Sequence, residues 1–372
     1  MTAQDSRSTI ELPLLTPAVL RACSFQNWYH SFRPHTFRST IITLEPPHIA
    51  YLRDSGHGLH LPEELDPVSS YESQLSDSED DTEAPQISSA GSSSSRSSSP
   101  PPRYSFPELT QAIAETIEQY GGSVFPKLNW SAPQDAGFLL VSGDGPLRCR
   151  SPMDVYMLLK GSDCIFHDLD VHEKISQASP DGSSLPVALV LREWFNLNPA
   201  HEFRCFVRDR NLIAISARYS TYYDFLLPQE VRQAIVERIH TFFETVIAPQ
   251  FHLSDFVFDV YLKNPTKIAS SSTAKPNLKL VDINPYATYI DPCLFSYEEL
   301  EEFYSNTVGA PSEPKQSTPL LKLVESEHPH QNFRASKFQT SKLPVEFVKF
   351  SQDQDVNHLS DEFRKMIESE KR

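Results

Sequence analysis

The run LKLVDINP at residues 278–285 decides the fold, together with the earlier run DFVFDVYL at residues 255–262. Both runs are rich in β-branched, aliphatic and aromatic residues, which is the composition of a β-strand. A loop of lysine, serine and proline residues separates them. We therefore predict two paired strands, each with polar residues among apolar neighbours.

The polar residues of these strands are predicted to meet. Side chains two residues apart share one face of a strand, so Asp282 and Asn284 point to the same side. The same rule places Asp259 on the face of Val257 and Tyr261 in the neighbouring strand. Three oxygen-bearing side chains would then converge between otherwise apolar strands.

Carboxylate and amide oxygens at one place are the ligands that Mg²⁺ takes, usually completed by water and substrate phosphates. The sequence therefore favours a magnesium site at Asp259, Asp282 and Asn284. Carboxylates buried among apolar residues are unfavourable unless they are compensated. The alternative is that Asp259 and Asp282 cap strand ends or pair with nearby lysines.

The rest of the chain mixes helices and strands. Residues 105–122 have apolar residues at helical spacing, a capping box from Ser105 to Glu108, and a glycine stop. Residues 123–130 read as a short strand that Pro126 restricts to an edge or to the end of a strand. Lys127 would lie just past that edge.

Further strands and one long helix complete the pattern. Residues 185–195 form a continuous apolar strand, and residues 202–216 form two strands joined by the polar turn RDRN. Residues 228–247 are predicted to be a helix with one apolar face made of Val231, Ile235, Ile239, Phe242 and Val246. Helices mixed with antiparallel hairpins indicate an α+β fold.

If a metal ion binds phosphates at this place, basic side chains must face the phosphates. The candidates are Lys127, Arg192, Arg204 and Arg218, each near an apolar strand. Each of them, taken singly, is more simply a surface or strand-edge charge. The chain contains 11 glycines and neither of the usual glycine-rich phosphate motifs. A nucleotide site here would have to hold phosphates with lysine, arginine and metal.

Composition marks the domain boundaries. Residues 64–102 are first acidic and then serine-rich, and such a segment cannot bury enough apolar surface to fold, so we predict a disordered insertion. We expect a flexible arm over residues 1–20, a linker over 308–340, and a tail over 341–372 with a short helix. The folded domain would span residues 21–307, interrupted by the insertion.

Charge and targeting signals limit the function classes. The chain has 33 Lys and Arg against 49 Asp and Glu, a net charge of −16, which opposes binding to nucleic acid or to an anionic membrane and suits a basic partner. Five scattered cysteines without a CxxC pair suggest reduced thiols. The N-terminus lacks the pattern of a signal peptide. We expect a soluble, cytoplasmic monomer.

Several ordered strings resemble the cell division cycle protein 123 family, also described as the D-one-two-three family. The resemblance covers roughly residues 21–307, with a fainter echo in KLPVEFVKFS at 342–351. It is carried by SFQNWYHSFRPHTFRSTII (24–42), GGSVFPKLNWSAPQDA (121–136), LVLREWF (189–195), PAHEFRCFVRD (199–209), FVFDVYL (256–262) and VDINPY (281–286).

This resemblance implies an ATP-grasp fold, in which two α+β subdomains with mixed or antiparallel sheets hold ATP and Mg²⁺ in the cleft between them. Residue by residue, Lys127 and Arg204 would meet phosphate. Three residues would line the nucleotide, namely Asn129, Ala132 and Asp135. Three more would follow the strand that edges the adenine, namely Arg192, Glu193 and Trp194. The matching magnesium ligands are Asp259, Asp282 and Asn284.

The resemblance also implies a function. It points to an assembly factor for eukaryotic translation initiation factor 2 that acts through the gamma subunit of that factor, with no direct contact to nucleic acid. The alternative is an ATP-grasp ligase that activates a carboxylate as an acylphosphate and transfers it to an amine. The residues themselves show no acyl-acceptor motif.

Overall fold

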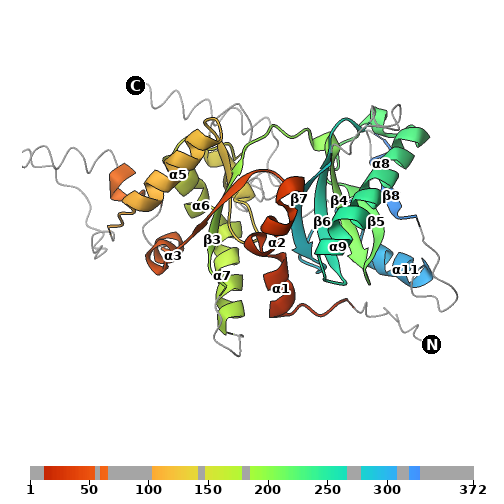
Figure 1. Ribbon diagram of the computed structural model, residues 1–372, viewed down its shortest axis with the longest axis horizontal. Helices are drawn as coiled ribbons and strands as arrows, with labels where there is room; N and C mark the ends of the chain where they lie inside the picture. Colours follow the sequence, from red (N-terminus) through yellow and green to blue (C-terminus); the bar gives the residue numbers. More distant parts are fainter. Residues whose placement is uncertain are drawn as a thin grey trace, which may run out of the picture.

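Two β-sheets with flanking helices make up the protein, as Figure 1 shows. The computed structural model describes residues 12–54, 59–65, 103–140, 147–177, 185–265, 278–307 and 318–326. The α+β class is confirmed. Most of the expected insertion, residues 66–102, lies outside the described residues, and so do residues 1–11 and the expected tail 341–372.

The larger sheet has five strands in the order β7-β6-β4-β5-β8. The predicted pairing of the two decisive runs is confirmed, because β6 and β7 are antiparallel neighbours. The predicted hairpin is β4–β5, whose turn residues Asp209 and Arg210 have positive φ angles of 45° and 60°. The strands are β4 (Glu202–Arg208), β5 (Asn211–Ala217), β6 (Phe256–Leu262), β7 (Leu278–Pro285) and β8 (Leu320–Lys322).

Strand β8 lies within residues 308–340, where the sequence suggested a linker. It pairs in parallel with β5, with Leu320 opposite Ala214. Leu323 and Val324, which follow the strand, are 6% and 5% exposed. The apolar run at 320–324 therefore adds an edge strand to the sheet and buries side chains that a linker would leave in water.

Helix α8 (Gln229–Phe242) covers one face of this sheet. The first four residues of the predicted apolar face are buried, namely Val231, Ile235, Ile239 and Phe242. The fifth, Val246, is half-buried, and Ile247 is buried in its place. The helix continues as a π-turn over Phe243–Ile247, and the wider turn shifts the apolar face by one residue.

The smaller sheet has three antiparallel strands in the order β1-β3-β2. The proline-containing strand β2 is at an edge, as predicted. The core beside the smaller sheet includes side chains from four helices. The elements are β1 (Ser39–Thr43), β2 (Val124–Lys127), β3 (Ala188–Glu193), α3 (Pro46–Arg53), α5 (Pro107–Gln119), α6 (Pro152–Lys160) and α7 (Asp163–Gln177).

Two short helices, α1 (Pro17–Cys23) and α2 (Phe25–Phe32), lie between the two sheets in Figure 1 and contact β7. The expected end of the flexible arm, residue 20, therefore falls inside α1. The buried side of α2 consists of large rings, namely Phe25, Trp28, Tyr29 and Phe32. These rings fill the space beside both sheets. The remaining elements are η1 (Arg33–His35), η2 (Glu63–Leu65), η3 (Gln134–Leu139), η4 (Pro199–His201), η5 (Asp224–Leu226), α9 (Ala248–Gln250) and α11 (Tyr297–Thr307).

The N-terminus of α5 is capped differently from the prediction. The capping box from Ser105 to Glu108 is wrong, because the N-cap residue is Phe106, which makes no side-chain cap. Instead the Glu64 carboxylate accepts from the Phe106 backbone N–H at 3.0 Å and from the Thr110 hydroxyl at 2.7 Å. A residue 42 positions away in the sequence satisfies the start of the helix.

This arrangement predicts that Glu64→Ala destabilises the protein by about 1 kcal/mol, the usual cost of removing an N-terminal cap. Glu108→Ala should cost less, because Glu108 would be essential only in a capping box. Urea unfolding of the two variants and the wild type measures the difference. A larger loss for Glu108→Ala would contradict the observed cap.

Candidate functional site

The aspartates of β6 and β7 lie opposite each other. In the strand register Asp259 pairs with Asp282, whereas the next residue, Val260, pairs with Leu280. Val281 is therefore an extra residue in β7, and the ladder contains a β-bulge at this point. Bulges of this kind re-aim side chains and occur often beside functional sites.

The bulge decides which face Asp282 presents. Leu278 and Leu280 are buried in the core that lies against α8. With strict alternation Asp282 would follow them into that core. The extra residue reverses the alternation, so Ile283 enters the core and Asp282 turns to the face of Asp259. The register therefore pairs Asp259 with Asp282, and the bulge places Asp282 on the face of Asp259.

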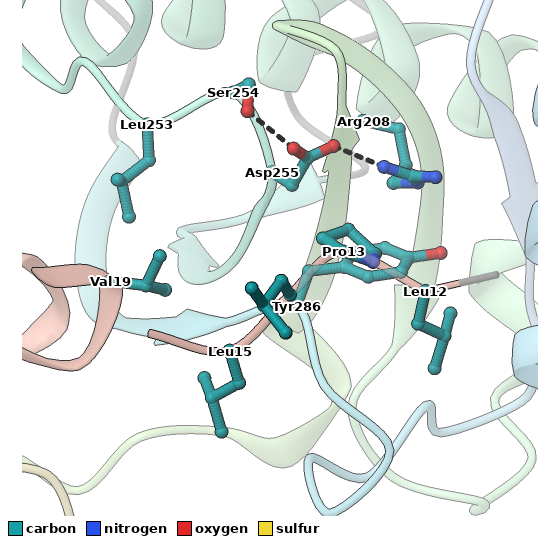
Figure 2. Close-up of a pocket in the computed structure, with 10 residues that line it drawn as sticks. Leu12, Pro13, Leu15, Val19, Arg208, Leu253, Ser254, Asp255 and Tyr286 are labelled. Atoms are coloured by element: carbon teal, nitrogen blue, oxygen red, sulfur yellow. Dashed lines mark hydrogen bonds and ion pairs between the residues drawn. The ribbon is translucent and has the colours of Figure 1, made fainter. Parts of the chain in front are cut away.

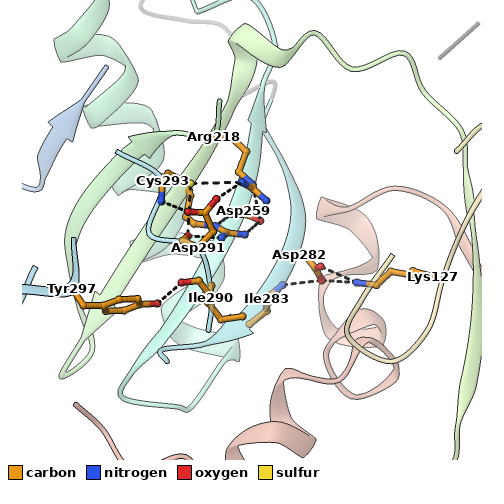
Figure 3. Close-up of polar contacts among 10 residues, drawn as sticks. Lys127, Arg218, Asp259, Asp282, Ile283, Ile290, Asp291, Cys293 and Tyr297 are labelled. Atoms are coloured by element: carbon orange, nitrogen blue, oxygen red, sulfur yellow. Dashed lines mark hydrogen bonds and ion pairs between the residues drawn. The ribbon is translucent and has the colours of Figure 1, made fainter. Parts of the chain in front are cut away.

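Asp259 is held by arginines of its own sheet and the neighbouring loop (Figure 3). The Arg204 guanidinium donates to both carboxylate oxygens, at 2.8 and 2.7 Å, and also to the Asp291 backbone carbonyl at 2.7 Å. Arg218 lies 3.9 Å from Asp259 and donates to Cys293 Sγ at 3.7 Å. Burial alone would raise the pKa of Asp259, but the charge of Arg204 outweighs it and lowers that pKa.

Asp282 is held from the other sheet. Lys127, at the end of β2, donates from Nζ to the two carboxylate oxygens at 2.9 and 2.8 Å, as Figure 3 shows. The Lys127 side chain is 3% exposed. Burial lowers the pKa of Lys127 even though the charge of Asp282 opposes the shift. The ion pair joins the two sheets. The sequence left open whether the aspartates pair with nearby cations, and the structure shows that Asp282 and Asp259 do so.

Arg192, near the end of β3, is a buried cation without a full set of partners. It is 7% exposed, and its Nε and Nη2 groups have no hydrogen-bond partner among the described residues. Its Cζ lies 5.1 Å from the centre of the Phe25 ring, over which Lys127 Nζ also lies at 5.3 Å. Buried donors without partners are costly, so this position favours an anionic ligand.

The predicted third metal ligand, Asn284, lies two residues beyond Asp282, opposite Val257, and is half-buried. Within the described ranges, no group of three or more His, Cys, Asp and Glu side chains is placed to hold a metal. A magnesium ion at the two aspartates would therefore need the Asn284 amide and ligands from outside the chain. This fits Mg²⁺, which usually retains water or phosphate oxygens.

Two of the residues expected to line the nucleotide make structural contacts. The Asn129 amide accepts from the Ala188 backbone N–H at 2.7 Å and donates to the Pro186 carbonyl at 3.0 Å. Asp135 accepts at the start of α7, from the Ser162 hydroxyl at 2.6 Å and the Asp163 N–H at 2.7 Å. These side chains fix the segment that follows β2. The third, Ala132, is half-buried against the core of the smaller sheet.

The residues expected near the adenine lie at the end of β3. Glu193 is bonded by Arg38 at 2.7 and 2.5 Å, and the Trp194 ring lies under the Arg148 guanidinium at 4.5 Å. Phe195 is 48% exposed. These two contacts hold the segment at the end of β3 in place.

Sequence reasoning missed Asp168 and Phe25. Asp168 is 3% exposed on α7 and accepts from the backbone N–H groups of Trp130 and Ser131. A signal was available, because Asp168 lies on the helix face of buried Ile165 and Leu169, where an apolar residue is expected. Phe25 lies in a run of aromatic residues that is typical of a buried core, so its position in the sequence does not indicate a site.

A separate pocket of about 410 Å³ lies where β4 and β7 end and β6 begins, and Figure 2 shows residues that line it. Arg208 supplies its positive charge, but this guanidinium already donates to Asp255 at 2.5 Å and to Glu301 at 2.9 and 2.8 Å. The opposing charges are satisfied within the protein. The two-aspartate site, which includes the incompletely bonded Arg192, is better suited to phosphate.

Across the described ranges, no helix is long and apolar enough to cross a bilayer.

Comparisons with known proteins agree on one family. The D123 family model matches residues 28–351. The chain is 32% identical to the translation initiation factor eIF2 assembly protein of Sclerotinia sclerotiorum, covering 96% of this chain and 89% of the relative, and 33% identical to that of Kluyveromyces lactis, covering 94% and 93%. The solved structure of Cdc123 from Schizosaccharomyces pombe superposes with a TM-score of 0.60 at 28% identity, over 85% of this chain and 100% of that one. The chain belongs to the D123 family.

Proposed function

We propose that this protein is an assembly factor for translation initiation factor eIF2, that it binds the gamma subunit, and that it carries Mg-ATP between its two sheets in the manner of an ATP-grasp protein. Membership of the D123 family supports the assembly role, because relatives named as eIF2 assembly proteins match nearly the whole chain. The nucleotide is supported by the charges of the site.

One observation carries the nucleotide proposal. Asp259 and Asp282 are paired in the register of β6 and β7, and four cations act on their carboxylates, namely Lys127, Arg192, Arg204 and Arg218. In the proposal, Asp259, Asp282 and Asn284 hold the magnesium ion. The phosphates are met by Lys127, Arg192 and Arg204. The chemistry that a bound magnesium ion would supply there is neutralisation of phosphate charge.

The two ion pairs suggest how the charges would be compensated when metal and nucleotide bind. Lys127 holds Asp282, and Arg204 holds Asp259. If these carboxylates turn to a cation and the basic side chains turn to phosphate, every buried charge keeps a partner. Phosphate alone would leave its charge against the two aspartates, and metal alone would leave Lys127 unpaired in a buried place. We therefore expect metal and nucleotide to bind together.

The partner proposal rests on charge as well as on the family. The chain has a net charge of −16, although Lys127, Arg192 and Arg204 are buried at the site. Because Asp168 and Asp259 are buried as well, the rest of the chain keeps about the same net negative charge, and it suits a basic face of a protein partner. Mg-ATP that favours the binding-competent state would strengthen the complex without turnover.

The first prediction concerns the metal ligands. Asp259→Asn and Asp282→Asn should each weaken Mg-ATP binding by about tenfold or more, which is about 1.4 kcal/mol. Asparagine is preferred to alanine because it keeps the side-chain volume beside Arg204 and Lys127. Calorimetric titration with and without Mg²⁺ measures the loss.

Asp255→Asn is the matched control for these variants. Asp255 is also ion-paired, with Arg208 at 2.5 Å, but it lies in the separate pocket. The Asp255→Asn variant should bind Mg-ATP with the same affinity as the wild type. Wild-type affinity in both Asp259→Asn and Asp282→Asn would contradict the magnesium site.

A second prediction separates assembly factor from ligase. Mg-ATP should increase capture of the eIF2 gamma subunit by the wild type, and Lys127→Met should abolish that increase. Lys322→Met removes a lysine of β8 that pairs with Glu299 of α11, and it should leave the increase unchanged. Gamma-subunit capture and ADP release are measured on the same samples. Acceptor-dependent ADP release by a wild type that captures no gamma subunit would support the ligase instead.

A further inference from the structure

Asp168 is a buried carboxylate that accepts hydrogen bonds from two backbone N–H groups and also bonds with the Ser131 side chain, while the charge of Lys127 acts on it through space. It lies on α7, in the smaller-sheet half of the molecule, and is 3% exposed. Its Oδ2 atom accepts from the Trp130 N–H at 3.0 Å and from the Ser131 N–H at 2.8 Å. One oxygen therefore fixes two successive peptide groups. Burial raises the pKa of Asp168 although these bonds oppose the shift.

The peptide groups that Asp168 fixes belong to the turn directly after Lys127. The turn is closed by a bond from the Leu128 N–H to the Ser131 carbonyl at 2.9 Å. Because only three residues separate Lys127 from Ser131, a shift of the turn would move the Lys127 backbone. The long side chain of Lys127 has many rotamers, so its fixed position requires support from its surroundings.

The same turn also places the ring beneath the cations. The Asn129 carbonyl accepts from the Phe25 N–H at 2.8 Å. The Phe25 ring lies under Lys127 Nζ at 5.3 Å and under Arg192 Cζ at 5.1 Å. A single element, the turn at residues 128–131, thus sets both the lysine and the aromatic platform that two cations share.

We propose that Asp168 is a positioning residue: by holding the turn at 128–131, it places the Lys127 ammonium against Asp282 and, in the loaded protein, against phosphate. The placement of Lys127 against phosphate rests on the proposed nucleotide function. The placement of Lys127 against Asp282 does not depend on a nucleotide. Among the described residues, no hydrogen bond joins Asp168 to Lys127 or to Asp282. The charge of Asp168 also acts on Lys127 through space, in addition to the position that Asp168 imposes through the backbone.

The test in the ligand-free protein is a double-mutant cycle. Urea midpoints are measured for the wild type, Asp168→Ala, Asp282→Asn and the double variant. If Asp168 positions Lys127, Asp282→Asn lowers the midpoint clearly in the wild type and by less than half as much in Asp168→Ala, where the ion pair is already misplaced. Asp255→Asn, whose ion pair is remote, should lower the midpoint equally in both backgrounds.

Asp168→Asn distinguishes position from charge. An amide oxygen can accept from both N–H groups, whereas the negative charge is lost. The proposal expects Asp282→Asn to have its full wild-type effect in this background. If Asp168→Ala does not fold, Asp168→Glu replaces it, because this change keeps the charge and displaces the accepting oxygens by one methylene. Equal effects of Asp282→Asn in all backgrounds, or a reduced effect with Asp168→Asn, would overturn the proposal.

The second readout is Mg-ATP affinity. Asp168→Ala should weaken binding by about tenfold and Asp168→Asn by less than about threefold, and the difference should vanish when Lys127 is changed to methionine. A difference that persists without Lys127 would overturn positioning through that lysine. If the wild type binds no Mg-ATP, the proposed nucleotide function fails, while the urea cycle still decides the role of Asp168.

Discussion

The ion pair between Lys127 and Asp282 is the interaction on which the rest of the structure depends. It joins an edge strand of the smaller sheet to an edge strand of the larger one at 2.8 Å, and the lysine side chain is almost completely buried. A buried charge is tolerated only with a partner, so neither residue can be removed alone without cost. The aromatic side of α2 fills the remaining space and supplies Phe25, over which two cations lie.

Local chemistry made much of this fold predictable. Strand composition predicted that β6 and β7 pair, and Pro126 indicated that β2 lies at an edge or at the end of a strand. Alternation alone was incomplete, however, because counting from Leu280 would have put Asp282 in the core. The bulge at Val281 has no signal in the sequence, since an extra residue is defined only by the partner strand.

Contacts between distant segments explain the other differences. Glu64 caps α5 in place of the nearby Ser105 and Glu108, and Asn129 bonds to the start of β3. Which polar residue satisfies a given backbone group depends on what the fold brings near it. For the same reason the sequence alone does not define the site. The sequence identified Lys127 and Arg192 as candidate cations, but these residues come close to Asp282 only because the fold brings the two sheets together.

The central claim is that the ion-paired carboxylates of the ligand-free protein form the place where metal and nucleotide bind, by exchange of partners. A crystal structure with Mg²⁺ and a non-hydrolysable ATP analogue tests it most directly. We expect the metal within about 2.0–2.1 Å of oxygens of Asp259, Asp282 and Asn284. Lys127 Nζ should then bond to a phosphate oxygen. A bound nucleotide beside an unchanged Lys127–Asp282 pair, with no metal at these oxygens, would contradict the claim.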